Sequence, residues 1–322
     1  MQNLFSVDIF KFRTALRDIT FDLFLKVSEN HFAHVFSKTT GLDYHRLEKY
    51  IDRGVRELFV QESDRAGYEA FISVTPESVF NDTNVSHEKR VAALLNMTEQ
   101  NLAGIFARFN VDDETATSSK KLVRGYVELM TDEPQSLAVI LKLISYGNYL
   151  YYHAVAVSVF SLLLARALGQ YDMQTLEVIG MGGFLHDIGR TQLPKEVNEC
   201  STDLTPEQWE VMKTHPKLGL NMLEKAKGIP EAVRFIVYQH HEQPGGGGYP
   251  NALRGTAIYA PAKIVGICDA FSALISARPW RPPFSVEQAI EVMESESGKF
   301  DKTLLKNLEV IFSKKFTSSK VA

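Results

Sequence analysis

The chain has 322 residues, of which 45% are hydrophobic and 23% carry a charge, as is typical of a globular protein large enough for two domains. Its formal net charge of −4 argues against a broad surface for DNA or anionic membranes, and its two cysteines exclude a disulfide scaffold. Because the first residues also lack the pattern of a signal peptide, we predict a cytoplasmic protein that binds neither DNA nor membrane.

The first part of the chain mixes strand and helix patterns. Alternating apolar residues between Phe21 and Val27 predict a strand, and the apolar run 32–36 could pair with it as a hairpin. Residues 43–54 predict a helix that stops at Gly54, and residues 57–60 could form a third strand. None of these segments carries a catalytic constellation.

From about Pro76 onward the apolar spacing is helical, and the polar stretch 112–119 predicts a break between helices. The fold class we predict is therefore mainly α. We expect an α+β or helical regulatory or interaction domain over residues 1–134 and an all-helical domain over residues 135–322. The N-terminal domain could sense a ligand or bind a protein partner. The helices between 85 and 150 could form the interface of a homodimer. They could equally pack within the core, because amphipathic helices have the same pattern in both cases.

Seven potential metal ligands are concentrated in the second domain, and five of them are histidines in a chain that has nine. They are His153, His186, Asp187, His215, His240, His241 and Asp269. Taken singly, each has an ordinary alternative as a core histidine or as a member of a buried ion pair. Together they are more ligands than one metal needs. A carboxylate can bridge two cations, and Asp187 is the candidate for that role.

The local sequence around these residues predicts where each lies. His153 falls on an uncharged, apolar helix that barely reaches the ~17–25 residues of a membrane span, and we interpret it as a buried core helix. The pair at 186–187 ends a helix for which Gly189 suits the position after the C-terminus. His215 follows a helix opened by a capping box at 205–208, and Pro216 biases it away from helical geometry.

The remaining ligands also end or interrupt apolar helices. His240 and His241 close a helix that Pro230 opens, and neighbours on a helix point about 100° apart. That divergence suits a site with more than one metal, or a distorted helix end. Asp269 lies within an apolar helix, where a lone carboxylate would need a strong partner. Nitrogen and oxygen ligands without thiolate favour two divalent metal ions, with iron as our first choice and manganese, zinc or nickel as alternatives.

The order H…HD…H…HH…D, with HHE and GxGYP in one loop, resembles the HD-GYP family of the HD phosphohydrolases over about residues 140–305. The matching segments are HDIGR (186–190), LTPEQWEVMKTHPKLG (204–219), HHEQPGGGGYP (240–250), RPWR (278–281) and GKFD (298–301). The resemblance implies a phosphodiesterase that hydrolyses cyclic di-GMP with a metal-activated water, to the linear dinucleotide or to GMP. It implies catalytic roles for Asp187 and Arg190. Its implied substrate contacts are Arg190, Gly248, Tyr249, Arg278 and Arg281.

Several positions depart from the family's usual pattern. Arg190 stands where a lysine is usual, Gly245 replaces an aspartate before GxGYP, and Trp280 replaces a tyrosine. Ser272 stands where the DxxDAL pattern has a carboxylate, so that an orienting contact, a substrate contact or a proton relay could be lost. Tyr149 occupies the position of a glutamate in members with a third metal, which favours two metals here.

None of these substitutions removes a proposed ligand, but they keep two alternatives open. One is a metal-containing receptor that binds cyclic di-GMP without cleaving it. The other is an HD hydrolase of a different phosphate ester, such as another cyclic dinucleotide.

Overall fold

The computed structural model describes residues 3–12, 18–28, 31–108, 111–132, 149–169, 172–198, 203–276 and 281–318. They form two compact units, Met1–Met97 and Thr98–Ala322, and the division falls within the helix α4 (His87–Arg108). The predicted boundary between residues 134 and 135 lies outside the described residues, and it stays a prediction.

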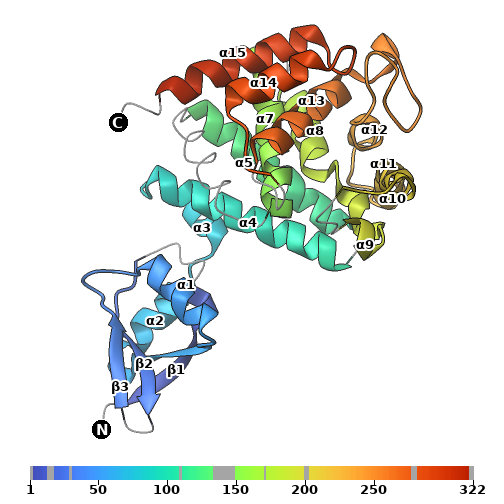
Figure 1. Cartoon of the computed structure of the whole chain (residues 1–322). Helices are drawn as coiled ribbons and strands as arrows, with labels where there is room; N and C mark the ends of the chain where they lie inside the picture. Colours follow the sequence, from blue (N-terminus) through green and yellow to red (C-terminus); the bar gives the residue numbers. More distant parts are fainter. Residues whose placement is uncertain are drawn as a thin grey trace. The chain divides into compact units, whose positions relative to one another are not determined.

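The first unit is built around an antiparallel sheet, of which β1, β2 and β3 are labelled in Figure 1. The sheet has four strands in the order β1-β4-β2-β3. Apolar residues of the strands pack with Leu47 of α1 and with Tyr68 and Phe71 of α2 to form its core. Its elements are β1 (Leu4–Asp8), a 3-10 helix (Ile9–Phe12), β2 (Leu23–Ser28), β3 (His31–Phe36), α1 (Tyr44–Asp52), β4 (Glu57–Gln61), a 3-10 helix (Glu62–Asp64), α2 (Arg65–Ile72) and α3 (Pro76–Asn81).

The predicted elements of this unit are confirmed, and one strand was missed. β2 and β3 form the expected hairpin, and α1 ends just before Gly54, which has a φ of 86°. Asp43 caps the start of α1 by accepting a hydrogen bond from the amide of Arg46. β1, which pairs with β4, was not predicted because its alternation is short.

The second unit is helical, and the fold class predicted from the sequence, mainly α with a smaller α+β N-terminal part, is confirmed. Its elements after α4 are α5 (Asp113–Asp132), α7 (Tyr149–Ala167), α8 (Met173–Leu185), η3 (a 3-10 helix, Ile188–Gln192), α9 (Lys195–Asn198), α10 (Pro206–Met212), α11 (His215–Leu223), α12 (Glu231–Gln239), η4 (a 3-10 helix, Gly255–Ala257), α13 (Ala260–Ile275), α14 (Val286–Ser295) and α15 (Lys302–Ser318). Among the described helices, none has both the length and the apolar character needed to span a bilayer.

The helices α7 and α8 lie at the centre of this unit and pack against one another and against α13 (Figure 1). α7 is buried along most of its described side chains, in agreement with its prediction as a core helix. Gly180 and Gly183 of α8 face α7 so closely that a Cβ at Gly183 would meet the backbone of Ser158 at 2.8 Å. This close approach brings the C-terminal end of α8 next to the buried face of α7.

The break predicted over residues 112–119 is misplaced, because α4 ends at Arg108 and α5 already begins at Asp113. Most of this polar stretch is therefore helical. Asp112 accepts a hydrogen bond from the amide of Thr115, and Asp113 and Glu114 lie in the first turn. These acidic residues therefore stabilise a helix start, because the orphan amides and the dipole at an N-terminus favour negative charge.

Candidate metal centre

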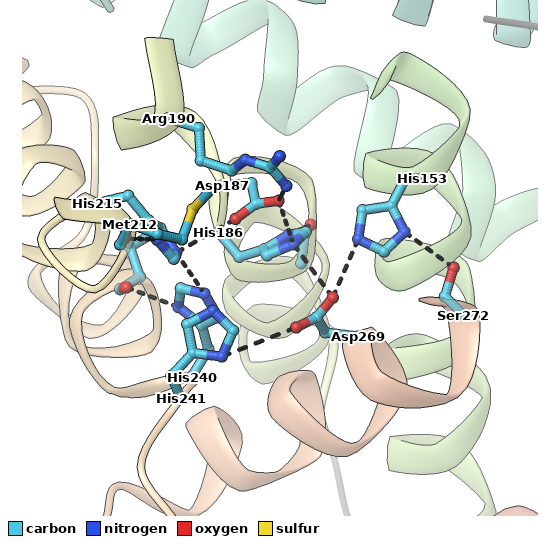
Figure 2. Close-up of polar contacts among 12 residues, drawn as sticks. His153, His186, Asp187, Arg190, Met212, His215, His240, His241, Asp269 and Ser272 are labelled. Carbon is cyan, nitrogen blue, oxygen red and sulfur yellow. Dashed lines mark hydrogen bonds and ion pairs between the residues drawn. The ribbon is translucent and has the colours of Figure 1, made fainter. Parts of the chain in front are cut away.

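The seven predicted ligands meet at one place in the helical unit (Figure 2). They form two groups, each with its ligand atoms within 4.8 Å of one another. The first group is Asp187, His215, His240 and His241, and the second is His153, His186 and Asp269. Five segments supply these side chains, so the site exists only once α7, α8, α11, α12 and α13 are packed.

Three of the histidines are oriented by a carbonyl three residues earlier in the chain. Nδ1 of His186, His215 and His240 lies 2.8 Å from the backbone oxygens of Gly183, Met212 and Val237, respectively. These carbonyls lie in the last turns of α8, α10 and α12. The last carbonyls of a helix have no amide partner within that helix, so they are available to accept a hydrogen bond from a side chain. Each Nδ1 therefore carries the proton, and each Nε2 presents a lone pair to the centre of the site.

The position of His215 corrects one expectation. His215 is the first residue of α11, and Pro216 occupies the first turn of that helix. Proline is accepted there because an amide at the first helical positions has no partner within the helix. The ring is directed inward by the carbonyl of Met212 rather than by a break in the helix.

This site fits metal ions because the Nε2 atoms of His186, His215 and His240, which face its centre, carry no proton. His215 Nε2 and His240 Nε2 lie 3.3 Å apart, although both rings carry their proton on Nδ1. His186 Nε2 is buried and has no hydrogen-bond partner among the described residues. Lone pairs that face each other in a buried site are unfavourable, and cations would satisfy them. The donor set therefore fits metal ions.

The two aspartates reach both groups of ligands. Asp187 Oδ1 lies 3.3 Å from His215 Nε2, and Asp187 Oδ2 lies 3.5 Å from His186 Nε2. Asp269 Oδ1 lies 3.0 Å from His153 Nε2, and Asp269 Oδ2 lies 4.0 Å from His241 Nδ1. Each carboxylate thus has one oxygen directed toward each group, an arrangement that suits bridging between two ions.

Burial lowers the pKa of four site histidines, which favours their neutral forms, whereas both aspartates stay ionised; the four are His153, His215, His240 and His241. Burial is the main reason that the pKa of His240 lies well below its ordinary value and that the pKa of His241 falls to about 3. Burial alone would raise the pKa of Asp187, but the Arg190 guanidinium, with the neighbouring rings of His186 and His215, outweighs it, and the pKa of Asp187 lies well below its usual range. The same balance, with His153 as the main counterweight, lowers the pKa of Asp269. These are the protonation states that metal ligands need.

Histidine 153 is held differently from the other histidines. Its Nδ1 lies 3.1 Å from Ser272 Oγ, and its Nε2 lies 3.0 Å from Asp269 Oδ1 (Figure 2). Both partners come from α13, three residues apart and therefore on one face of that helix.

Glycines around the site permit close backbone packing. A Cβ at Gly189 would overlap the backbone of His215, so this residue is needed as a spacer within η3 and not as the helix terminator predicted for it. A Cβ at Gly248 would overlap the backbone of His241 and Gln243, and one at Gly245 would press on Gly298. The glycine-rich loop thus needs its glycines to fold on itself. A contact between Gly248 and a substrate stays a prediction.

A cavity of about 270 Å³ opens beside the site. His240, His241 and Asp269 form one wall. The side chains that line the rest include Trp209, Tyr249, Lys263, Lys299 and Phe300. Of these, only Tyr249 was singled out from the sequence. Trp209 lies in the segment 204–219, and Lys299 and Phe300 lie in the segment 298–301, where the family resemblance was the only available indication. Lys263 lies in α13, in the same apolar helix as Asp269.

The other predicted site residues lie as follows. Arg190 Nη1 donates to Asp187 Oδ2 at 3.0 Å, and its Nε donates to Asn198 Oδ1 at 3.2 Å. The Arg281 guanidinium donates to backbone oxygens at the end of α13 and lies over Phe284, 4.3 Å from the ring centroid. Arg278 and Trp280 fall outside the described residues. The catalytic and substrate-binding roles of all these residues stay predictions.

Comparisons with known proteins assign the helical part of the chain to a family. The family described as HD domain matches residues 138–304. The cyclic di-GMP phosphodiesterase PA4108 of Pseudomonas aeruginosa is 30% identical over 220 residues, which are 67% of this chain and 53% of that protein. The cyclic di-GMP phosphodiesterase response regulator RpfG of Xanthomonas campestris is 33% identical over 42% of this chain and 36% of its own. The 3'3'-cGAMP-specific phosphodiesterase 2 of Vibrio cholerae is 28% identical over 46% of this chain and 28% of its own.

The chain therefore spans about half or less of the length of these curated relatives. Among solved structures, Bd1817, an HDG"Y"P protein from Bdellovibrio bacteriovorus, aligns with a TM-score of 0.69 over 97% of this chain and all of its own. At 21% identity, this likeness concerns the fold alone.

Proposed function

The chain belongs to the HD domain family, in its HD-GYP branch, and on that premise we propose that it is a metal-dependent phosphodiesterase that hydrolyses cyclic di-GMP. The observation that carries this proposal is the convergence of seven buried or half-buried ligands into two groups; three of the seven, His240, His241 and Asp269, line one cavity. When bound, two divalent ions supply a water of lowered pKa and polarise the phosphodiester.

The protein's own side chains hold and tune this centre. Asp187 and Asp269 are proposed to bridge the two sites, since each has an oxygen directed toward each group. Arg190 is proposed to orient Asp187 and to offer positive charge to a substrate phosphate. It cannot act as a proton donor, because its guanidinium stays charged. We propose iron as the metal, with manganese, zinc or nickel as alternatives. Cys268 offers no thiolate, because burial raises its pKa to about 12.

The cavity beside the metal ligands is proposed to receive part of the cyclic dinucleotide. Its volume, about 270 Å³, lies just below the range of about 300–1,000 Å³ for whole small-molecule sites. Trp209, which is 46% exposed, and Phe300 present aromatic surface on which a base could stack. We propose that Tyr249, Gly248, Arg278 and Arg281 complete the substrate site.

A single experiment tests this proposal. Protein purified without oxygen is analysed for bound metal, and its action on cyclic di-GMP is followed by chromatography in the same samples. We expect about two metal ions per chain and a cleaved product, either the linear dinucleotide or GMP. Asp187→Asn should lose both, whereas Asp203→Asn, an exposed aspartate outside the site, should lose neither. A parent protein without stoichiometric metal would contradict the proposal.

A receptor that retains intact cyclic di-GMP is the second candidate. Two features of the centre favour it. Arg190 stands in the position of a lysine and is engaged with Asp187 and Asn198, and the neutral Ser272 stands in the position of a carboxylate. Two metals with uncut, bound nucleotide would support this reading. Under either reading, we propose residues 1–134 as the regulatory or interaction domain, in a cytoplasmic protein that could form a homodimer.

The hydrolysis of a related ester is the third candidate, because one relative is named as specific for 3'3'-cGAMP. A panel of cyclic dinucleotides, each at the same concentration, separates it from the first candidate. A faster reaction with a nucleotide other than cyclic di-GMP would support it.

A further inference from the structure

The buried hydroxyl of Ser272 contacts Nδ1 of His153, a position that a backbone carbonyl occupies for three of the other site histidines. His186, His215 and His240 are each oriented by a carbonyl three residues earlier in the chain. His153 instead lies with Nδ1 3.1 Å from Ser272 Oγ, across the interface between α7 and α13. The orientation of this ring therefore depends on a side chain that a point mutation can remove.

Metal binding would select one tautomer of the His153 ring. Nε2 faces the ionised Asp269 and the second group of ligands, and Nδ1 faces the hydroxyl. Without metal, Nε2 can donate its proton to Asp269. A metal ligand needs its lone pair on the nitrogen that faces the site, so with metal bound the proton must lie on Nδ1. Ser272 Oγ then accepts that proton, as the carbonyl oxygens do for the other histidines. Ser272 is only 1% exposed, and water does not replace it readily.

We propose that Ser272 is a positioning residue that fixes the tautomer and orientation of His153, and so sets the metal affinity of the group His153, His186 and Asp269. This inference rests on the metal centre of the proposed function, although it does not depend on which substrate is cleaved. Of the three roles considered for position 272, namely an orienting contact, a substrate contact and a proton relay, the proposal assigns the first to Ser272.

Because Ser272 is a neutral partner for His153, the metal affinity of the group His153, His186 and Asp269 should be modest. A carboxylate that accepts the Nδ1 proton makes the imidazole a stronger ligand, and loss of such a partner typically lowers metal affinity roughly 10–100-fold. A hydroxyl carries no charge, so it orients the ring with little gain in ligand strength. The second group should therefore bind its ion more weakly than the first group, which has four ligands.

Metal titration of the full-length chain tests the proposal. Chelator-treated protein is titrated with Mn²⁺ in a calorimeter, for the parent and for Ser272→Ala, Ser272→Asp and Ser276→Ala. We expect two binding events in the parent. In Ser272→Ala the weaker event should lose affinity roughly 10–100-fold, and the stronger should be retained. Ser272→Asp, which restores an acceptor for Nδ1, should recover the lost affinity or exceed the parent.

Ser276→Ala is the matched control. Ser276 lies one turn further along α13, and its hydroxyl donates to the backbone oxygen of Ser272 without touching a ligand. It should bind both ions as the parent does. Thermal melting of the metal-free variants checks the fold, because a structural defect alone would lower stability before any metal is added. If Ser272→Ala fails to fold, Ser272→Cys gives the same comparison with a side chain of similar size and a weaker acceptor.

The outcomes are separable. Equal affinity for both ions in Ser272→Ala and the parent would overturn the role of Ser272. Two metals in a parent that does not cleave cyclic di-GMP would contradict the proposed function alone, and the comparison of the Ser272 variants would still hold. No metal in the parent would overturn both.

Discussion

The ring of Tyr249 covers the ring of His241, with centroids 4.7 Å apart and planes 31° from parallel. Tyr249 belongs to the glycine-rich loop, and His241 is a predicted ligand at the wall of the cavity. The loop therefore contributes to the metal site by packing, in addition to any contact with substrate.

Replacement of Tyr249 should separate these two roles. Tyr249→Ala removes the ring contact, which is worth about 0.5–1.5 kcal/mol, so we expect metal affinity to fall roughly 2–13-fold. Tyr249→Phe keeps the ring and should bind metal as the parent does. Titration of both variants with Mn²⁺ measures this difference. Parent-like affinity in Tyr249→Ala would limit the residue to substrate binding or to neither role.

The metal-free protein should lose stability as the pH falls from about 6.5 toward 3. The pKa of His241 is lowered from 6.5 to about 3, mainly by burial, and that of His240 is also lowered well below 6.5. In the unfolded chain these rings take up protons below about pH 6.5, whereas in the folded chain they stay neutral. The unfolded state then binds more protons, and stability is lost with acid.

Thermal melting of chelator-treated protein over this pH range measures the effect. His241→Gln, which removes one of the histidines with a lowered pKa, should show a shallower fall than the parent. A melting temperature that is independent of pH in this window would show that the rings are not buried in neutral form.

Gly266→Ala should damage the metal site through its backbone. A Cβ at Gly266 would overlap the carbonyl oxygen of His240, which caps the C-terminal end of the neighbouring helix α12. Relief of such an overlap requires movement of His240 and typically costs about 1–3 kcal/mol or more. Gly67→Ala is the control, because its Cβ would meet only side-chain atoms, at 3.3 Å or more, within a helix that alanine favours.

The expected result is a lower melting temperature and weaker metal binding in Gly266→Ala, with neither change in Gly67→Ala. Full metal occupancy in Gly266→Ala would mean that the interface between α12 and α13 tolerates this movement without displacing His240.

Arg281→Ala should lower stability. Its guanidinium donates to the backbone oxygens of Ala273 and Leu274, at 3.0 and 3.1 Å, at the C-terminal end of α13. Hydrogen bonds from a charged donor contribute about 1.5–3 kcal/mol, and we expect a loss of that order in denaturant unfolding. Lys302→Ala, an exposed cation at the start of α15, should cost little. Unchanged stability with weaker nucleotide binding would instead support the predicted substrate contact.

The sequence alone was sufficient to predict the helical fold class and to select seven candidate ligands that the structure brings together, because both depend on local patterns. Apolar spacing and capping residues such as Thr205 and Asp43 mark helices without knowledge of their neighbours. The ligands could be recognised because a histidine or aspartate in an apolar helix needs a partner wherever that helix lies. The misplaced break before α5 shows the limit of this approach, since polar residues both end helices and begin them.

Only the packed helices decide how the ligands divide into two groups, which nitrogen of each ring faces inward, and which residue orients His153. These features depend on contacts between segments far apart in the chain, such as Ser272 with His153 and Gly266 with His240. No local pattern encodes such distances, because they follow from how α7, α8, α12 and α13 pack. The same reason explains why Gly248 and Gly189 are spacers between backbone segments, a role that the sequence could not distinguish from a ligand contact or a helix end.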